Sequence, residues 1–173
     1  SIKFLSEYTC NKKSNILKFF LSGLPIFSKN LCSKKIENSD SFKKPELELT
    51  IEQKKAIQEL YSLDNKKFDV LILDGITGSG KTRVYMHKAI QSIKDGFQCL
   101  VLVPEIILTE QWVKEIEIDF GIKALIYHSS VKKKVREKIW INMNLGYPGI
   151  VVGTRSSLCI PFKNLGLVVV DEE

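Results

Sequence analysis

The most constraining feature of this sequence is the segment 75–82, which reads Gly-Ile-Thr-Gly-Ser-Gly-Lys-Thr. It fits the pattern G-x-x-x-x-G-K-S/T at every defined position, and it lies between an apolar run and a helical pattern, as a phosphate-binding loop requires. Glycines let such a loop curl with its N–H groups inward, and the N-terminus of the following helix adds positive potential beneath bound phosphates. We therefore expect this segment to bind the phosphates of ATP.

Each residue of this loop is a candidate nucleotide ligand: Gly75, Ile76, Thr77, Gly78, Ser79, Gly80, Lys81 and Thr82. In such loops the lysine reaches the β- and γ-phosphates, and the hydroxyl of the last residue binds Mg²⁺. The sequence thus predicts a catalytic role for Lys81 and a metal-binding role for Thr82.

An acidic partner for the loop follows the apolar run at residues 167–170, where Asp171 and Glu172 come next. Asp171 is placed to hold Mg²⁺ through its water shell, and Glu172 is placed to orient the attacking water. Two adjacent carboxylates are also common at a helix N-terminus, but the presence of the phosphate loop favours the catalytic interpretation. We expect Lys81, Asp171 and Glu172 to form the catalytic set.

Short apolar runs alternate with helical patterns along the chain. The runs are residues 68–73, 99–103, 122–127, 150–152 and 167–170, and helical patterns follow at 81–93, after Pro104 and after Ser130. Each run is too short for a helix and too uniformly apolar for a half-exposed strand, which favours a parallel sheet covered on both faces. The predicted fold is α/β, with a doubly wound parallel sheet.

Two helices can be described in more detail. Thr50 and Gln53 have the Thr-x-x-Gln form of a capping box, which predicts a helix over residues 51–62. After Ser130, an inward stripe is expected at Val131, Val135 and Ile139. The basic residues around this stripe favour a solvated helix face: Lys132, Lys133, Lys134, Arg136 and Lys138.

Charge and composition divide the chain into three parts. The first 44 residues carry nine lysines against three acidic residues, whereas the other 129 residues carry 17 charges of each sign. Lys, Ser and Asn dominate residues 28–49, which is typical of a linker. We expect a small helical segment over residues 1–27, this linker, and a domain over residues 50–173. Because the chain lacks an initial Met and stops just after an apolar strand, we also expect a fragment.

No apolar run approaches the roughly 20 residues that a membrane-spanning helix needs, so no membrane association is expected. Four scattered cysteines form no C-x-x-C pair, and they indicate neither a zinc knuckle nor a disulfide framework. Reduced thiols favour a cytoplasmic location.

Four blocks of sequence together resemble a known family. They are residues 73–85, 102–111, 152–158 and 170–173, and their Pro-Glu-Ile and Gly-Thr-Arg-Ser segments are the most discriminating parts. In order and spacing they are similar to the primosomal protein N′ (PriA) family of superfamily 2 DNA helicases, which restarts stalled replication in bacteria. The resemblance implies a RecA-like helicase lobe, part of an enzyme that couples ATP hydrolysis to DNA unwinding.

The resemblance also implies roles for particular residues. Gln53 would read the adenine edge, although its place in the capping box gives it an equally complete structural role. The motif Ia residues would be Pro104, Glu105, Thr109 and Gln111, and the motif Ic residues would be Thr154 and Arg155. In such helicases these residues line the track of the single DNA strand. Both blocks follow apolar strands, which places them at the sheet edge where ligands collect.

Residues 1–27 resemble the family's segment that enters its winged-helix module, so a partial winged-helix DNA-binding remnant is expected there. The resemblance implies single-stranded and forked DNA as ligands, and primosome and single-strand-binding proteins as partners. The family's second ATPase lobe, arginine finger and zinc-binding cysteines lie beyond residue 173. Because an arginine finger contributes about 10³ to 10⁵ in rate, we expect this chain alone to hydrolyse ATP poorly. Unwinding needs two lobes that move against each other, so we expect the chain to bind ATP and Mg²⁺ without unwinding DNA.

Two alternatives remain open at this stage. Another superfamily 2 helicase, such as a RecG-like recombination enzyme, would carry a similar phosphate loop. A degraded remnant of a helicase gene would bind nucleotide without turnover. The sequence beyond Glu173 would separate these hypotheses, because an Asp-Glu-x-His motif followed by a second lobe supports the replication-restart enzyme.

Overall fold

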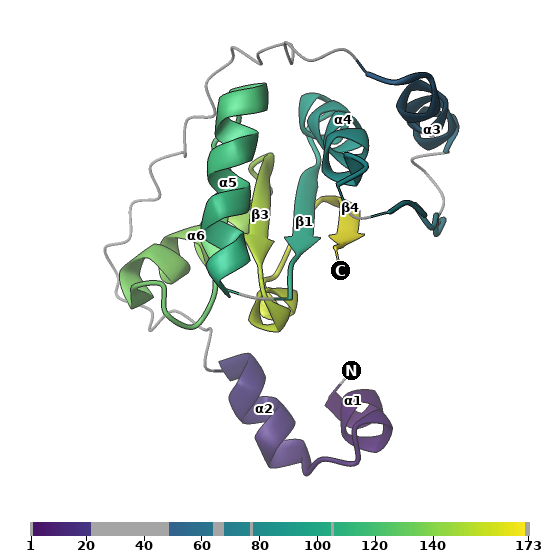
Figure 1. Cartoon of the computed structure of the whole chain (residues 1–173). Coiled ribbons are helices and arrows are strands. Elements are labelled where there is room, and N and C mark those ends of the chain that lie inside the picture. The colour runs from purple at the N-terminus through teal and green to yellow at the C-terminus, as the bar shows by residue number, and fades with distance from the viewer. Residues whose placement is uncertain (1, 22–48, 64–67, 77, 105, 172–173) are drawn as a thin grey trace.

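The computed structural model describes residues 2–21, 49–63, 68–76, 78–104 and 106–171 of the chain. Helices and strands alternate from residue 81 onward, as predicted (Figure 1). The elements are α1 (Ile2–Tyr8), α2 (Lys13–Leu21), α3 (Ile51–Ser62), α4 (Lys81–Lys94), β1 (Gln98–Leu102), α5 (Ile106–Phe120), β2 (Leu125–Tyr127), α6 (Lys133–Leu145), β3 (Gly149–Gly153), the 3-10 helix η1 (Arg155–Cys159) and β4 (Leu165–Val170).

The sheet is parallel, with the strand order β2-β3-β1-β4. Its register aligns the last residue of β1, Leu102, with Gly153 of β3 and with Val170 of β4. The segments that leave these three strands therefore emerge side by side at one edge of the sheet. The prediction of an α/β fold with a parallel sheet is confirmed, and this shared edge is where ligands bind in such folds.

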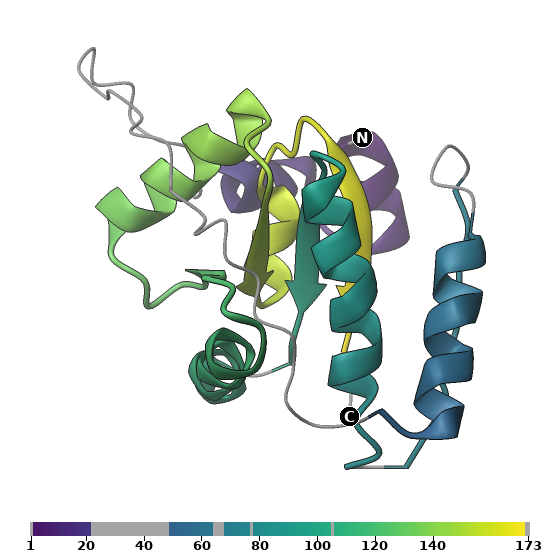
Figure 2. The same ribbon diagram turned by 90° about the horizontal axis from the view of Figure 1, so that it is seen from above.

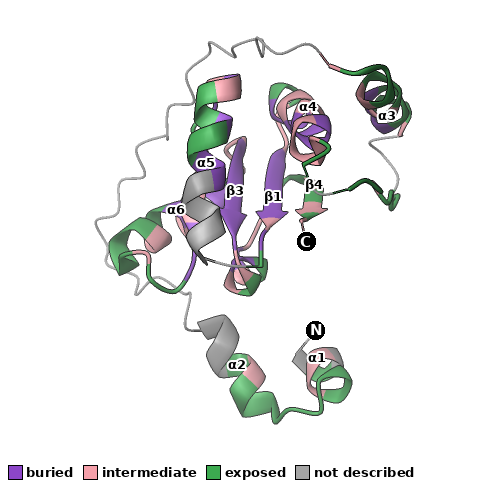
Figure 3. Cartoon of the chain, in the orientation of Figure 1, coloured by how far each residue is buried: buried purple, intermediate pink, exposed green. Residues whose placement is uncertain are grey.

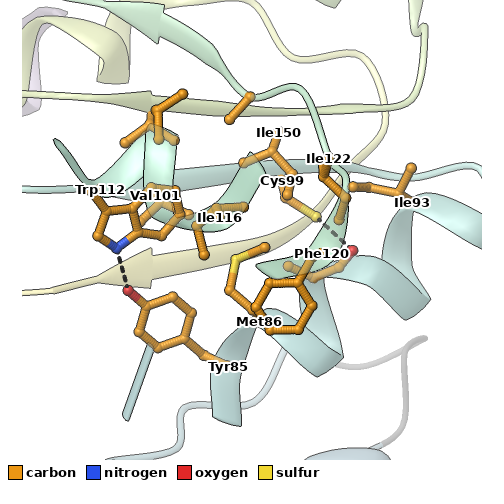
Figure 4. Close-up of a cluster of buried hydrophobic side chains, with 14 of the residues drawn as sticks. Tyr85, Met86, Ile93, Cys99, Val101, Trp112, Ile116, Phe120, Ile122 and Ile150 are labelled. Carbon is orange, nitrogen blue, oxygen red and sulfur yellow. Dashed lines mark hydrogen bonds between the residues drawn. The ribbon is translucent and has the colours of Figure 1, made fainter. Parts of the chain in front are cut away.

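Helices cover both faces of the two central strands. On one face, α4 and α5 pack with Cys99 and Val101 of β1 in a cluster that includes Met86 and Phe120 (Figure 4). On the other face, Leu100 packs in a second cluster that contains residues of α6. Figure 3 shows β1 and β3 as the most continuously buried elements. This alternation of neighbouring residues between two helical layers is the doubly wound arrangement.

The predicted strand at residues 68–73 is wrong. This segment has no strand structure, and Phe68 is 93% exposed and Ile72 is 87% exposed. A strand exists only where a neighbour accepts and donates its backbone hydrogen bonds. Within the described part of the chain, β4 is instead the edge strand on that side of the sheet. Apolar composition was therefore not sufficient to make this segment a strand.

The expected cover on both faces is also wrong for β4. Leu167 and Val169 pack against the cluster beneath α4, whereas Val168 is 46% exposed and Val170 is 60% exposed. This alternation is typical of a strand with one covered face. The reason is that α4 lies over only one side of β4.

In α6, the expected inward stripe holds only in part. Ile139 is buried, together with Met143 one turn later, but Val135 is 46% exposed. Because α6 begins at Lys133, Val135 lies in its first turn, ahead of the turns that pack on the sheet. The basic residues around it are mostly solvent-exposed, as expected of a solvated face.

The N-terminal part contains α1 and α2, which contact each other. The linker predicted at residues 28–49 lies outside the described residues except for Leu49, and so does Cys32. Cys10, Cys99 and Cys159, the cysteines in the described part, are free thiols. None of the described helices combines the length and the apolar character needed to cross a membrane.

Candidate functional site

The phosphate loop adopts a backbone conformation that its glycines permit. Gly78 and Gly80 have φ values of +79° and +81°, in the left-handed region that side chains disfavour. Gly80 is the N-cap of α4, and its carbonyl accepts from the N–H of Arg83 at 3.0 Å. The loop therefore leads directly into a helix N-terminus, the arrangement that binds phosphate through backbone N–H groups.

Lys81 lies across this loop. Its Nζ donates to the carbonyl oxygen of Gly75 at 2.7 Å and lies 3.5 Å from that of Ile76. The ammonium group is thus held at the start of the loop by backbone oxygens. A phosphate oxygen in the same place would offer Lys81 a stronger, charge-assisted partner.

Gln53 connects the helix α3 to the loop. Its Oε1 accepts from the N–H of Thr50 at 3.0 Å, and its own N–H donates to the Thr50 hydroxyl at 3.2 Å, which confirms the capping box. Its Nε2 donates to the carbonyl oxygen of Ser79 at 2.8 Å. The sequence missed this second contact, although a capping-box glutamine uses only its oxygen in the cap and keeps its amide N–H₂ available. Contact of Gln53 with adenine stays a prediction.

The helix α3 also packs beside α4 (Figure 2). Ile57 and Leu60 form a small buried cluster with Val84. The end of the phosphate loop is therefore held by two helices, by α3 through the Gln53 amide at Ser79 and by α4, which begins at Lys81.

Asp171 lies at the end of β4, where its N–H donates to the carbonyl oxygen of Leu102 at 2.9 Å. Its Oδ2 accepts from the hydroxyl of Tyr85 at 2.7 Å, and that hydroxyl lies 3.4 Å from Oγ1 of Thr82. The fold thus brings the predicted metal ligands Thr82 and Asp171 to one side chain of α4. No motif of the sequence assigns a role to Tyr85, although it lies three residues after Thr82 and so on the same helix face.

Tyr85 is buried, and its hydroxyl is fully engaged. The Nε1–H of Trp112 in α5 donates to the Tyr85 oxygen at 2.9 Å (Figure 4). Burial and the hydrogen bond to Asp171 raise the pKa of Tyr85 well above its ordinary value of 10.0. The phenol therefore stays protonated and acts as the donor to the Asp171 carboxylate.

A cavity of about 430 Å³ opens beside these groups. Its walls are the loop, the first turn of α4, the later turns of α5 and Asp171. Arg83 and Asp119 both line the cavity and form an ion pair at 3.5 Å. This volume is within the range of small-molecule sites. No sequence motif indicated that α5 contributes to the wall.

The oxygen atoms around Asp171 suit Mg²⁺, which prefers hydroxyl, carboxylate and phosphate oxygens. Thr82 and Asp171 supply the first two kinds, and their approach to one Tyr85 hydroxyl places them together. Thr77 and Glu172, which the sequence also predicts as site residues, lie outside the described residues.

The predicted DNA-track residues follow β1 and β3 at the same edge of the sheet. Pro104 and Arg155 are exposed, and the carbonyl oxygen of Thr154 accepts from Ser157 at 2.9 Å. Glu105 lies outside the described residues, as do the side chains of Thr109 and Gln111 in α5. The structure therefore brings Pro104 and Thr154, which follow the paired strands β1 and β3, to the same edge.

Comparison with known proteins identifies the class. The DEAD/DEAH box helicase family matches residues 50–173, and the chain belongs to this family. Among curated relatives, the chain is 37% identical over 172 residues to the replication restart protein PriA of Rickettsia felis, which covers 99% of this chain and 26% of the relative. It is 33% identical over 183 residues to PriA of Haemophilus influenzae, covering 100% of this chain and 25% of the relative.

A third relative, PriA of Synechocystis sp., is 41% identical over 126 residues, or 73% of this chain and 15% of the relative. The predicted resemblance to the PriA family is confirmed. The chain spans about a quarter of the length of the first two relatives.

Proposed function

We propose that this chain is the ATP-binding lobe of a DNA helicase that acts in replication restart. The observation that carries the proposal is the convergence of Lys81, Thr82 and Asp171 at one loop and cavity, on a sheet of the expected topology. The family match and the similarity to PriA proteins support the same function.

In this proposal residues 75–82 bind the phosphates of ATP through backbone N–H groups, and Lys81 exchanges its contact with Gly75 for the β- and γ-phosphates. Thr82 and Asp171 hold Mg²⁺, which neutralises charge on the phosphates when bound. Glu172 orients the attacking water, and Gln53 contacts the adenine edge while keeping the loop attached to α3.

We further propose that the edge formed by the ends of β1 and β3 receives a single DNA strand. Arg155 supplies an exposed guanidinium group for a phosphate. Pro104, Glu105, Thr109, Gln111 and Thr154 would complete the track. Single-stranded and forked DNA, primosome proteins and single-strand-binding proteins are the corresponding partners of the whole protein, and the cytoplasm is the corresponding location.

The test is the substitution Lys81→Ala, measured by titration with a fluorescent ATP analogue in the presence of Mg²⁺. We expect at least a tenfold loss of affinity, because a charge-assisted contact to phosphate contributes more than a neutral hydrogen bond. Lys94→Ala is the matched control, since it removes the same charge from the other end of α4. An unchanged affinity in Lys81→Ala would contradict the assignment of the loop.

A further inference from the structure

The hydroxyl of Tyr85 joins the end of β4 to the helix α5. It donates to Asp171 at 2.7 Å and accepts from Trp112 at 2.9 Å. We propose that Tyr85 is a positioning residue, which orients the Asp171 carboxylate for Mg²⁺ and couples that carboxylate to α5 through Trp112. The inference rests on the proposed function, because it assumes that Asp171 holds Mg²⁺.

Hydrogen-bond chemistry sets the direction of this chain of contacts. The indole N–H of Trp112 can only donate, so it occupies a lone pair of the Tyr85 oxygen. The single phenol proton is then available for Oδ2 of Asp171. With Oδ2 held in this way, the other carboxylate oxygen is left for a metal ion, as in sites where a neighbouring hydrogen bond orients a ligating group.

Packing makes the contact to Trp112 rigid. The two rings are stacked, with centroids 6.3 Å apart and planes inclined by 12°. Tyr85 is 7% exposed and Trp112 is 8% exposed, and both belong to the buried core cluster that covers β1. Because close-packed interiors transmit small displacements, a shift of the Tyr85 hydroxyl either moves Trp112 or breaks their hydrogen bond.

The position of Trp112 gives this coupling a direction toward DNA. Trp112 lies in α5 one residue after Gln111 and three after Thr109, both of which we place in the DNA track. A change at the metal ligand Asp171 thus reaches, through two side chains, the helix that would carry that track. Through this connection, binding of nucleotide and Mg²⁺ would change the position of α5 and so alter the DNA track.

A purely structural role for Tyr85 makes a different prediction. If the hydroxyl only satisfies a buried indole N–H, its removal lowers stability and leaves the dependence of ATP binding on Mg²⁺ unchanged. If it positions Asp171, its removal weakens the response to Mg²⁺ specifically.

The experiment uses the 173-residue chain with Trp140→Phe, which leaves Trp112 as its one tryptophan. The ATP affinity of this parent chain is compared with that of the same chain carrying Tyr85→Phe. Calorimetric titration measures both affinities over a range of Mg²⁺ concentrations and with excess chelator. We expect Tyr85→Phe to need about tenfold more Mg²⁺ for the same ATP affinity, since loss of a partner that orients a metal ligand typically costs about 10- to 100-fold. Without Mg²⁺, the two affinities should agree.

Trp112 supplies an independent readout. Adding ATP and Mg²⁺ should change its fluorescence emission in the Tyr85 chain, and this change should disappear in Tyr85→Phe. Tyr127→Phe is the control, because Tyr127 is equally buried but belongs to the cluster on the other face of the sheet. That variant should keep both the Mg²⁺ dependence and the emission change.

Equal Mg²⁺ dependence in the Tyr85 and Tyr85→Phe chains would overturn the inference while leaving the proposed function intact. Failure of the Tyr85 chain to bind ATP at any Mg²⁺ concentration would overturn both. If thermal denaturation showed Tyr85→Phe to be unfolded, Trp112→Phe would carry the calorimetric test, since it removes the indole donor and keeps an aromatic ring. We expect Trp112→Phe to weaken the dependence of ATP affinity on Mg²⁺, but by less than the tenfold expected for Tyr85→Phe. An unchanged dependence on Mg²⁺ in Trp112→Phe would overturn the coupling.

Discussion

The two segments that flank the phosphate loop have apolar side chains in opposite environments. Residues 68–73 come before the loop, with Phe68 93% exposed and Ile72 87% exposed. The helix α4 comes after it, with Met86 and Ala89 fully buried. The exposed segment is the more uniformly apolar of the two, because α4 also carries Lys, Arg, His and Gln residues. Apolar composition therefore does not explain the difference.

The explanation lies in where each segment finds its backbone hydrogen bonds. A helix satisfies its own N–H and C=O groups, so α4 needs only an apolar surface on which to pack. An extended segment needs a neighbouring strand with free backbone groups in the correct register. Local sequence therefore predicts a helix more securely than a strand, even beside the same loop.

The largest expected effect on stability comes from a substitution in the buried helix α4. Met86→Ala should lower the free energy of unfolding by about 2–5 kcal/mol, because it removes a fully buried side chain and leaves a cavity. Ile72→Ala is the matched change on the exposed flank and should stay within about 0.5 kcal/mol of the parent. Urea unfolding measures both, and equal losses would mean that residues 68–73 are buried in solution.

A second prediction concerns the helix that precedes the exposed segment. Thr50→Ala should cost about 1 kcal/mol of stability, because it removes the hydroxyl that accepts from Gln53 in the capping box. Ser62→Ala at the other end of α3 is the control, since its hydroxyl donates to the carbonyl oxygen of Glu59 within the same helix and takes no part in the N-terminal cap. Thermal or urea unfolding provides the measurement, and the cap would lose its assigned role if the two variants were equally stable.

The smallest expected effect is a dependence of the free energy of unfolding on pH, which arises from His87 in α4. Burial lowers the pKa of His87, whose ring meets Phe120 edge-on with centroids 5.9 Å apart. The unfolded chain then binds more protons than the folded chain just below the ordinary pKa of 6.5, so stability falls as pH drops through this window.

His87→Gln should reduce the slope of the free energy of unfolding against pH on the acidic side of this window. His128, the other histidine, is present in both proteins. Urea unfolding at several pH values between neutral and mildly acidic compares the slopes. If the slope were the same in both proteins, protonation of His87 would not be its source.

Much of the fold and part of the site were predictable from the sequence, because the signals are local. The patterns that predicted the phosphate loop, the cap at Thr50 and the alternation of strands and helices each consist of residues that are neighbours along the chain. The same local reasoning was wrong for residues 68–73, for the outer face of β4 and for Val135. In each of these places, cover by a separate element decides exposure, and apolar composition does not report it.

The sequence by itself determined the place of the phosphate-loop motif, residues 75–82, because the motif is a pattern of neighbouring residues. Only the tertiary structure decided that Tyr85 meets Asp171, 86 residues away in the chain, and that Trp112 completes the contact. The physical reason is that such contacts depend on strand order and helix packing, which arise from the summed burial of many side chains.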